Sequence, residues 1–173
     1  MTNKDYIASY ELSKVFKKNY KPLRQDINRL DQALRAFRHE GRHQLGKNLN
    51  QMSDAIHSLK FRLTCLMRNE EKRLFPFIVT HVPKFQPLIY LLFSEHEDFR
   101  KFLRRLTISL AALRKKNGSF ESSHRIHKIS EESIYLVCLL RNHLRIEDEK
   151  IFVALRKELH ASEKEKLVTY LTS

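Results

Sequence analysis

Apolar residues return at every third or fourth position along four separate stretches of this chain. Such a spacing keeps the side chains on one face of an α-helix, and that face has to be buried against other helices. We call these faces the first to fourth stripes. They comprise Phe16, Tyr20, Leu23, Ile27, Leu30, Leu34 and Phe37; Met52, Ile56, Leu59, Leu63, Leu66, Glu70, Leu74 and Phe77; Ile89, Leu92, His96, Phe99, Leu103, Leu106, Leu110 and Leu113; and Ile129, Ser133, Leu136, Leu140, His143, Glu147, Ile151 and Ala154.

Four amphipathic helices with short connections predict an all-α, antiparallel up-down four-helix bundle, in which the stripes meet on the axis. Breaks are expected at Gly41 to Gly46, at Pro83 and Pro87, and at "KKNGSFESS". If the first helix proper begins near Lys21, Pro22 falls in its first turn.

Both ends of the chain are predicted to add helix to this bundle. An amphipathic segment with Tyr6, Ile7 and Tyr10 is expected to lead into the first helix. A short helix is predicted near the C-terminus from Ser162, whose side chain would form a capping box with Glu165.

The composition fits one domain over residues 1–173, with the bundle core at about residues 20–158. The chain of 173 residues contains three glycines, four prolines and two cysteines. We expect Cys65 and Cys138 to be buried thiols in a reducing cytoplasm, because two cysteines are too few for a disulfide scaffold. No apolar run is long enough to cross a bilayer and no secretory signal precedes the first helix, so we expect a cytoplasmic protein without a membrane partner.

Lysine and arginine outnumber the acidic residues by 33 to 20, a net charge of +13. Clustered basic residues favour nucleic acid or anionic partners, because they release counterions from phosphates. Here they occur as short pairs such as Lys17-Lys18 and Arg104-Arg105, and no nucleic-acid-binding motif accompanies them. We therefore expect a solvated basic surface without specific nucleic-acid binding.

Four acidic or imidazole side chains interrupt the apolar stripes: Glu70, His96, His143 and Glu147. A buried carboxylate has to be neutralised, paired or bound to a cation. His143 and Glu147 lie one helical turn apart on the same face, and Glu70 holds the equivalent place on another helix. Two imidazoles and two carboxylates in a bundle core form a plausible ligand set for iron, zinc or manganese.

These residues also carry a family resemblance. "LMRNEEKRLFPF" and "HLRIEDEKIF" resemble the two His-x-x-x-Glu-Glu repeats of hemerythrin-like (HHE cation-binding) domains. "LFSEHEDFRKFL" is similar to the Glu-His motif of the family's third helix, and "LRQDINRLDQAL" to the motif of its first helix. The motifs occur in the expected order and cover about residues 20 to 158.

The resemblance implies a four-helix bundle with a non-haem di-iron centre that binds oxygen, handles iron, or senses oxygen or nitric oxide. The family's usual ligands would fall at positions 27, 66, 70, 96, 143 and 147. This chain carries Ile27 and Leu66 where the family has histidines, and Asp148 shortens the second acid of one repeat. The departures put a complete di-iron centre in doubt.

Two alternatives follow for the site. It could hold one metal, iron or else zinc or manganese, through Glu70, His96, His143 and Glu147. It could instead be vestigial and metal-free, with the two glutamates bonded to protonated histidines. Glu71 and Asp148 would either face basic neighbours or orient the histidines from behind.

Two functions correspond to these alternatives. We expect a metal-binding protein that responds to iron, dioxygen or nitric oxide, and not an enzyme, because no Ser-His-Asp order, phosphate loop or pair of catalytic carboxylates in a recognisable cleft appears. The other hypothesis is a metal-free interaction module that binds an acidic protein partner through its basic surface.

Overall fold

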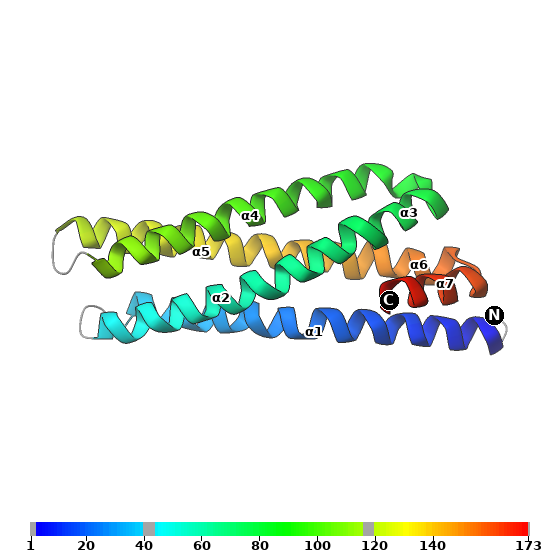
Figure 1. The fold of residues 1–173 in the computed structure, drawn as a ribbon, viewed down its shortest axis with the longest axis horizontal. Coiled ribbons are helices and arrows are strands. Elements are labelled where there is room, and N and C mark those ends of the chain that lie inside the picture. Colours follow the sequence, from blue (N-terminus) through cyan, green and yellow to red (C-terminus); the bar gives the residue numbers. More distant parts are fainter. Residues whose placement is uncertain (1–2, 40–43, 116–119, 173) are drawn as a thin grey trace. The chain divides into compact units, whose positions relative to one another are not determined.

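The computed structural model describes residues 3–39, 44–115 and 120–172, and every element within these ranges is helical (Figure 1). The elements are α1 (Asn3–His39), α2 (Leu45–Asn69), η2 (Glu70–Leu74), α3 (Phe75–His81), η3 (Pro83–Phe85), α4 (Gln86–Lys115), α5 (Phe120–Ile146), η4 (Glu147–Phe152), α6 (Val153–Glu158) and α7 (Ala161–Thr172). Both η2 and η4 are π-helical, whereas η3 is a 3₁₀ turn. The predicted all-α fold is confirmed.

The chain forms two compact units, and α1, α2, α4 and α5 each contribute residues to both. Unit 1 comprises Met1–Pro22, Leu63–His96 and His143–Ser173, and unit 2 comprises Leu23–Arg62 and Glu97–Asn142. The organisation of residues 1–173 as a single domain stays a prediction. Within the described ranges, no helix is both long and apolar enough to span a membrane.

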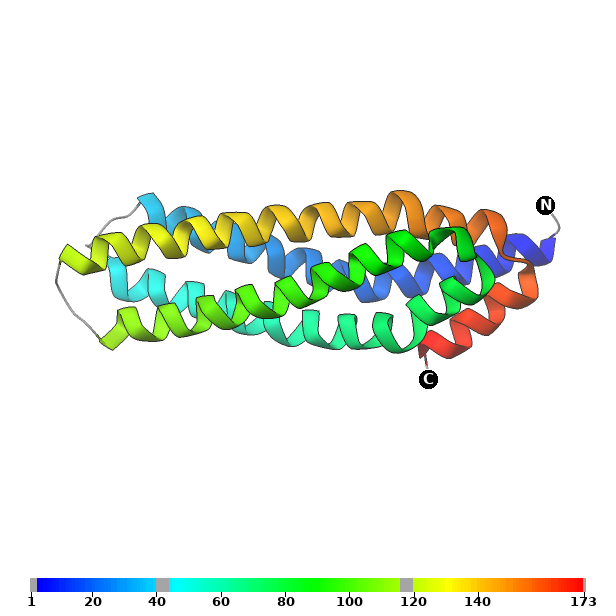
Figure 2. The ribbon, with the colours of Figure 1, turned by 90° about the horizontal axis from the view of Figure 1, so that it is seen from above.

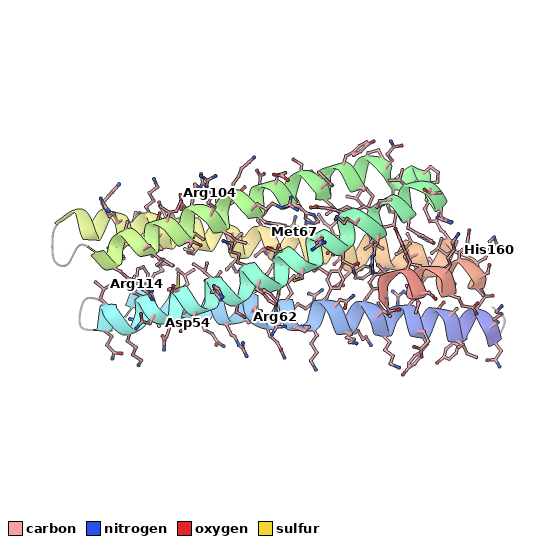
Figure 3. All side chains as sticks on the ribbon, in the orientation of Figure 1. Asp54, Arg62, Met67, Arg104, Arg114 and His160 are labelled. Atoms are coloured by element: carbon pink, nitrogen blue, oxygen red, sulfur yellow. The ribbon has the colours of Figure 1, made fainter. Side chains whose placement is uncertain are left out.

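Unit 2 is a ring of four antiparallel helical segments. The antiparallel register is visible in α1 and α2, because Asp26 pairs with Arg62 whereas Asn48, at the other end of α2, bonds the carbonyl of Ala36. Three further polar contacts connect the other neighbouring helices of the ring: Arg114 with Asn50 at 2.7 Å, Arg105 with Glu132 at 3.8 Å, and Arg141 with Asp31 at 3.0 Å. Figure 3 labels Arg62 on α2 and Arg114 on α4.

Unit 1 contains the N-terminal part of α1, the end of α2 with η2 and α3, the start of α4, and the end of α5 with η4 and α6. Helix α7 starts close to the N-terminal end of α1 and runs obliquely to it (Figure 2), and Lys4 and Glu165 approach to 3.7 Å. On its other side α7 meets η2, because Arg73 donates a hydrogen bond of 2.9 Å to the carbonyl of Tyr170. The predicted C-terminal helix is therefore packed within unit 1.

Every residue of the four stripes is buried. Leu92 and Phe99 on α4 are fully inaccessible, as are Leu136 and Leu140 on α5. The spacing of apolar residues thus identified the buried face of all four helices, since burial of that face is what stabilises a helix bundle.

Two helices begin at other residues than the sequence predicted. Helix α1 begins at Asn3 and not near Lys21, so Pro22 lies inside it, and the segment around Tyr6 is part of the same helix. A proline inside a helix removes one hydrogen bond, and the buried stripe on both sides offsets this cost. Helix α7 begins at Ala161 and not at Ser162: the backbone N–H of His160 donates to Glu163 Oε2 at 2.7 Å, which replaces the predicted Ser162–Glu165 box.

The first of the predicted breaks also needs correction. Part of the Gly41 to Gly46 segment lies outside the described residues, but Gly46 itself is in the first turn of α2. Proline acts as expected at the next break, where α3 ends at His81 and α4 begins at Gln86. In "KKNGSFESS", residues 116–119 lie outside the described ranges.

The expectation of buried thiols is wrong, because Cys65 and Cys138 are both exposed. Each lies one position away from a buried residue, next to Leu66 on α2 and Val137 on α5 respectively. A shift of one residue turns a side chain by about 100° around the helix, which is enough to move it from the core to solvent.

Candidate metal centre

The four polar residues of the stripes are all buried in unit 1. Glu70 is the first residue of η2 and Glu147 the first residue of η4, whereas His96 lies on α4 and His143 near the end of α5. Their exposed fractions are 2% or less. Apolar packing of the stripes therefore carries two imidazoles and two carboxylates into the interior.

Glu70, His96 and His143 converge on one point. The Nε2 atoms of His96 and His143 are 3.3 Å apart, and His96 Nε2 is also 3.3 Å from Glu70 Oε2. One donor atom from each of the three residues lies within 4.8 Å of the others. Two atoms bound to one ion at about 2.1 Å in a tetrahedral arrangement would be about 3.4 Å apart. These separations suit donors that share a cation.

Glu147 lies beside this group. Its Oε1 atom is 3.7 Å from His143 Nε2, and its side chain is fully buried. Glu147 is not one of the three residues whose donor atoms lie within 4.8 Å of one another. Of the four predicted ligands, the structure therefore brings three together and places the fourth next to His143.

A second pair of carboxylates contacts the opposite side of each imidazole. Glu71 Oε1 is 2.8 Å from His96 Nδ1, and Glu95 Oε2 is 2.6 Å from His143 Nδ1. A carboxylate at Nδ1 fixes the tautomer that carries its proton there and leaves a lone pair on Nε2. The two Nε2 lone pairs then face each other across 3.3 Å, together with the negative charge of Glu70. A positive charge between them offsets this repulsion, either a metal ion or a proton on one Nε2, so the donor set fits a bound metal.

Tyr20 adds a contribution from α1. Its phenol O–H donates a hydrogen bond to Glu70 Oε1. Burial raises the pKa of Tyr20 well above its usual range, and the charges of Glu147 and Glu70 raise it further. Tyr20 is therefore a neutral hydrogen-bond donor at physiological pH.

Both candidate carboxylates lie at π-helical turns. In such a turn the N–H bonds to the carbonyl five residues back, and these turns occur often at functional sites. The stripes carry a matching irregularity: spacings of three and four alternate throughout, except that two fours follow each other at 66–70–74 and at 143–147–151. The extra residue is accommodated by η2 and η4. A repeated four within a stripe was thus the sequence signal for the π-turns.

The sequence prediction did not include two residues of this site. Glu95 is the glutamate of the Glu-His motif in "LFSEHEDFRKFL", but its position in the sequence does not indicate which histidine it would reach. Tyr20 belongs to the first stripe and was interpreted as core. By contrast, Glu71 takes the orienting position that was one of its two alternatives, whereas Asp148 is exposed.

Both aliphatic replacements are buried. Leu66 is 9% exposed and lies on α2 in unit 1, one turn before Glu70. Ile27 is 1% exposed within unit 2. Each fills core volume with a side chain that has no metal-binding atom.

Comparison with known proteins agrees with this geometry. The model of the hemerythrin HHE cation-binding domain matches residues 13–155. No curated protein and no solved structure matched the sequence. Because the matched segment covers most of the chain and includes Tyr20, both π-turns and both histidines, the chain belongs to the hemerythrin HHE cation-binding domain family.

Proposed function

We propose that this protein binds one iron ion through Glu70, His96, His143 and Glu147, and that it senses or handles iron, dioxygen or nitric oxide without acting as an enzyme. The proposal rests on one observation above all. Two buried imidazoles direct their Nε2 atoms at each other across 3.3 Å while a separate carboxylate contacts each Nδ1 atom.

The donor set favours iron or manganese over a structural zinc ion. Two imidazole nitrogens with carboxylate oxygens suit iron or manganese, whereas closed structural zinc sites favour cysteine, and both cysteines of this chain are exposed. A bound iron would supply the affinity for diatomic gases that histidine and carboxylate side chains lack. The residues described here would hold the ion and keep it in a dry interior.

A single ion is favoured over two because of Leu66. The family resemblance would place an imidazole at this position, one helical turn before Glu70. The buried leucine removes one nitrogen ligand from the immediate neighbourhood of Glu70, and Ile27 provides none on α1. A second ion would therefore have too few ligands of its own.

Metal analysis of protein purified without an affinity tag tests the proposal. We expect one iron per chain, and we expect Glu147→Ala and His143→Ala to lower that value. Two irons per chain would contradict the single-ion assignment. Metal-free protein whose melting is unchanged by added metal or chelator would instead favour the interaction module with its basic surface. An acidic protein partner would then be the expected ligand.

The gas-binding part of the proposal has its own measurement. The iron(II) form is titrated with nitric oxide under anaerobic conditions and followed by optical and electron paramagnetic resonance spectroscopy. An adduct that disappears in His143→Ala supports gas binding at the centre. Iron that is bound stoichiometrically but forms no adduct would restrict the role to iron handling.

A further inference from the structure

We propose that Tyr20 is a positioning residue for the metal centre: it binds one oxygen of Glu70 and thereby assigns the other oxygen to the metal. This inference rests on the proposed function, because it presumes that a metal binds. It adds a residue from α1, a helix that supplies none of the four proposed ligands.

The two oxygens of Glu70 have different neighbours. Oε1 accepts the hydrogen bond from the phenol of Tyr20, whereas Oε2 lies 3.3 Å from His96 Nε2. A carboxylate that is free to rotate could present either oxygen, or both, to a cation. The hydrogen bond from Tyr20 holds Glu70 in an orientation that presents Oε2 to the shared centre. Hydrogen bonds to ligating carboxylates have this orienting effect in metal sites.

The phenol ring is itself held in place by aromatic packing. Tyr20 is 3% exposed. The centre of its ring lies 6.2 Å from that of Phe16 and 5.0 Å from that of Phe152, both in edge-on arrangements. Phe16 and Phe152 stack on each other at 3.8 Å. Phe152 ends η4, the π-turn that begins with Glu147. The cluster therefore links the donor for Glu70 to the segment that carries the other carboxylate.

The place of Tyr20 on α1 is consistent with this role. It belongs to the first stripe and lies seven residues, or about two helical turns, before Ile27. The family resemblance would put a metal-binding imidazole at position 27, where this chain has an aliphatic side chain. Helix α1 thus contributes a hydrogen-bond donor in place of a ligand atom, and its contribution reaches the metal through Glu70.

Tyr20→Phe tests the inference, because it removes the phenol O–H and keeps the packed ring. Iron(II) and cobalt(II) affinities of the full chain are measured by competition with a chelator. We expect binding to weaken by about 10- to 100-fold, the range found for outer-sphere partners of metal ligands. We also expect the visible absorption of the cobalt(II) form to change, because Glu70 would no longer be held to one mode of coordination.

Tyr170→Phe is the matched control. It deletes the same atom from another tyrosine of unit 1, whose hydroxyl donates to the carbonyl of Lys72 at 3.3 Å and not to a candidate ligand. We expect its metal affinity and cobalt spectrum to equal those of the wild type.

The outcomes separate the inference from the proposed function. Wild-type protein that binds no metal refutes the proposed function and removes the basis of the inference. Wild-type protein that binds metal while Tyr20→Phe keeps the same affinity and spectrum overturns the inference alone. Circular dichroism and melting of the metal-free form show whether Tyr20→Phe is folded.

The double variant with Glu70→Ala tests whether the loss of metal affinity comes instead from disturbed packing. If Tyr20 acts through Glu70, Tyr20→Phe should cause no additional loss of metal affinity in Glu70→Ala protein. A further loss in that background would mean that Tyr20 supports the fold and not Glu70, which would overturn the assignment.

Discussion

Glu95 and His143, on neighbouring helices, are joined by a contact of 2.6 Å between Oε2 and Nδ1. The next residue after Glu95 is His96, whose own Nε2 atom faces His143 Nε2 at 3.3 Å. Two consecutive residues of α4 therefore act on one imidazole of α5 from opposite sides. Helix α4 orients one candidate ligand and supplies another.

Glu95→Gln and Glu71→Gln should weaken metal binding while leaving the bundle folded. An amide keeps the shape of the side chain but removes the negative charge that favours the proton on Nδ1 and the lone pair on Nε2. We expect each change to reduce affinity by about 10- to 100-fold in a chelator competition assay. Glu97→Gln is the control, because Glu97 is exposed and pairs with Arg100. Equal affinity in all three variants would contradict an orienting role.

Leu66→His should destabilise the metal-free protein and increase its response to metal. The substitution buries an imidazole where the structure has an apolar side chain, at a cost of about 1–3 kcal/mol. The new nitrogen lies one turn before Glu70 and becomes available to a cation. Thermal melts with and without iron(II) should show a lower melting temperature for the metal-free variant and a larger stabilisation by metal than in the wild type. Leu63→His is the control, because it lies one turn further from Glu70. It should lower the melting temperature of the metal-free protein without increasing the stabilisation by metal.

The pair formed by Asp31 and Arg141 should make stability depend on pH. Partial burial acts to raise the pKa of Asp31, but the hydrogen bonds and charges of Arg141 and Arg35 outweigh it, so the pKa lies below the usual value of 3.8. The stabilisation is therefore fully present above that value and is lost as pH falls through the lower pKa of the folded state. Arg141→Ala should cost about 0.5–1 kcal/mol at pH 7, because the arginine is half exposed.

Urea unfolding at pH 7 and at pH 3 measures this dependence. The difference between Arg141→Ala and the wild type should shrink at the lower pH. In Asp31→Asn protein the same arginine change should have an effect that does not vary with pH. A constant difference in both backgrounds would show that the ion pair is not the source of the stabilisation.

Arg73→Ala should loosen α7 without unfolding the bundle. Arg73 donates to the carbonyl of Tyr170 at 2.9 Å and lies 5.6 Å from the centre of its ring. Tyr170 is exposed and Arg73 is only partly buried, so we expect a cost of at most about 1 kcal/mol in global stability. Hydrogen exchange should become faster in residues 161–172 and stay unchanged in α4. The exposed Lys101→Ala, which removes a contact within α4, is the control.

The sequence was sufficient to predict the buried face of each long helix. Residues such as Leu92 and Leu136 recur with the helical period, and burial of apolar surface is the dominant contribution to folding. It was not sufficient to place Pro22, because local preference favours a helix start at proline whereas packing on both sides extends the helix through it. Tertiary packing outweighed the local preference there.

The same distinction applies to the candidate site. Glu70, His96, His143 and Glu147 could be selected because polar residues in an apolar stripe require an explanation. Glu95 could not be assigned to His143, since its partner is 48 positions away and depends on how two helices align. Tyr20 was read as core because its ring is indeed packed there, and only the position of its hydroxyl reveals the bond to Glu70.

The π-turns η2 and η4 interrupt two otherwise regular α-helices at corresponding positions. Each accommodates one surplus residue and begins with a glutamate that points inward. Deleting Lys72 or Glu149 would let the helix wind normally and would keep the downstream core residues in phase, yet it would change where the carboxylate is aimed. If a deletion leaves the melting temperature of the protein unchanged but lowers its affinity for the metal ion, the π-turn serves metal binding and is not needed for stability.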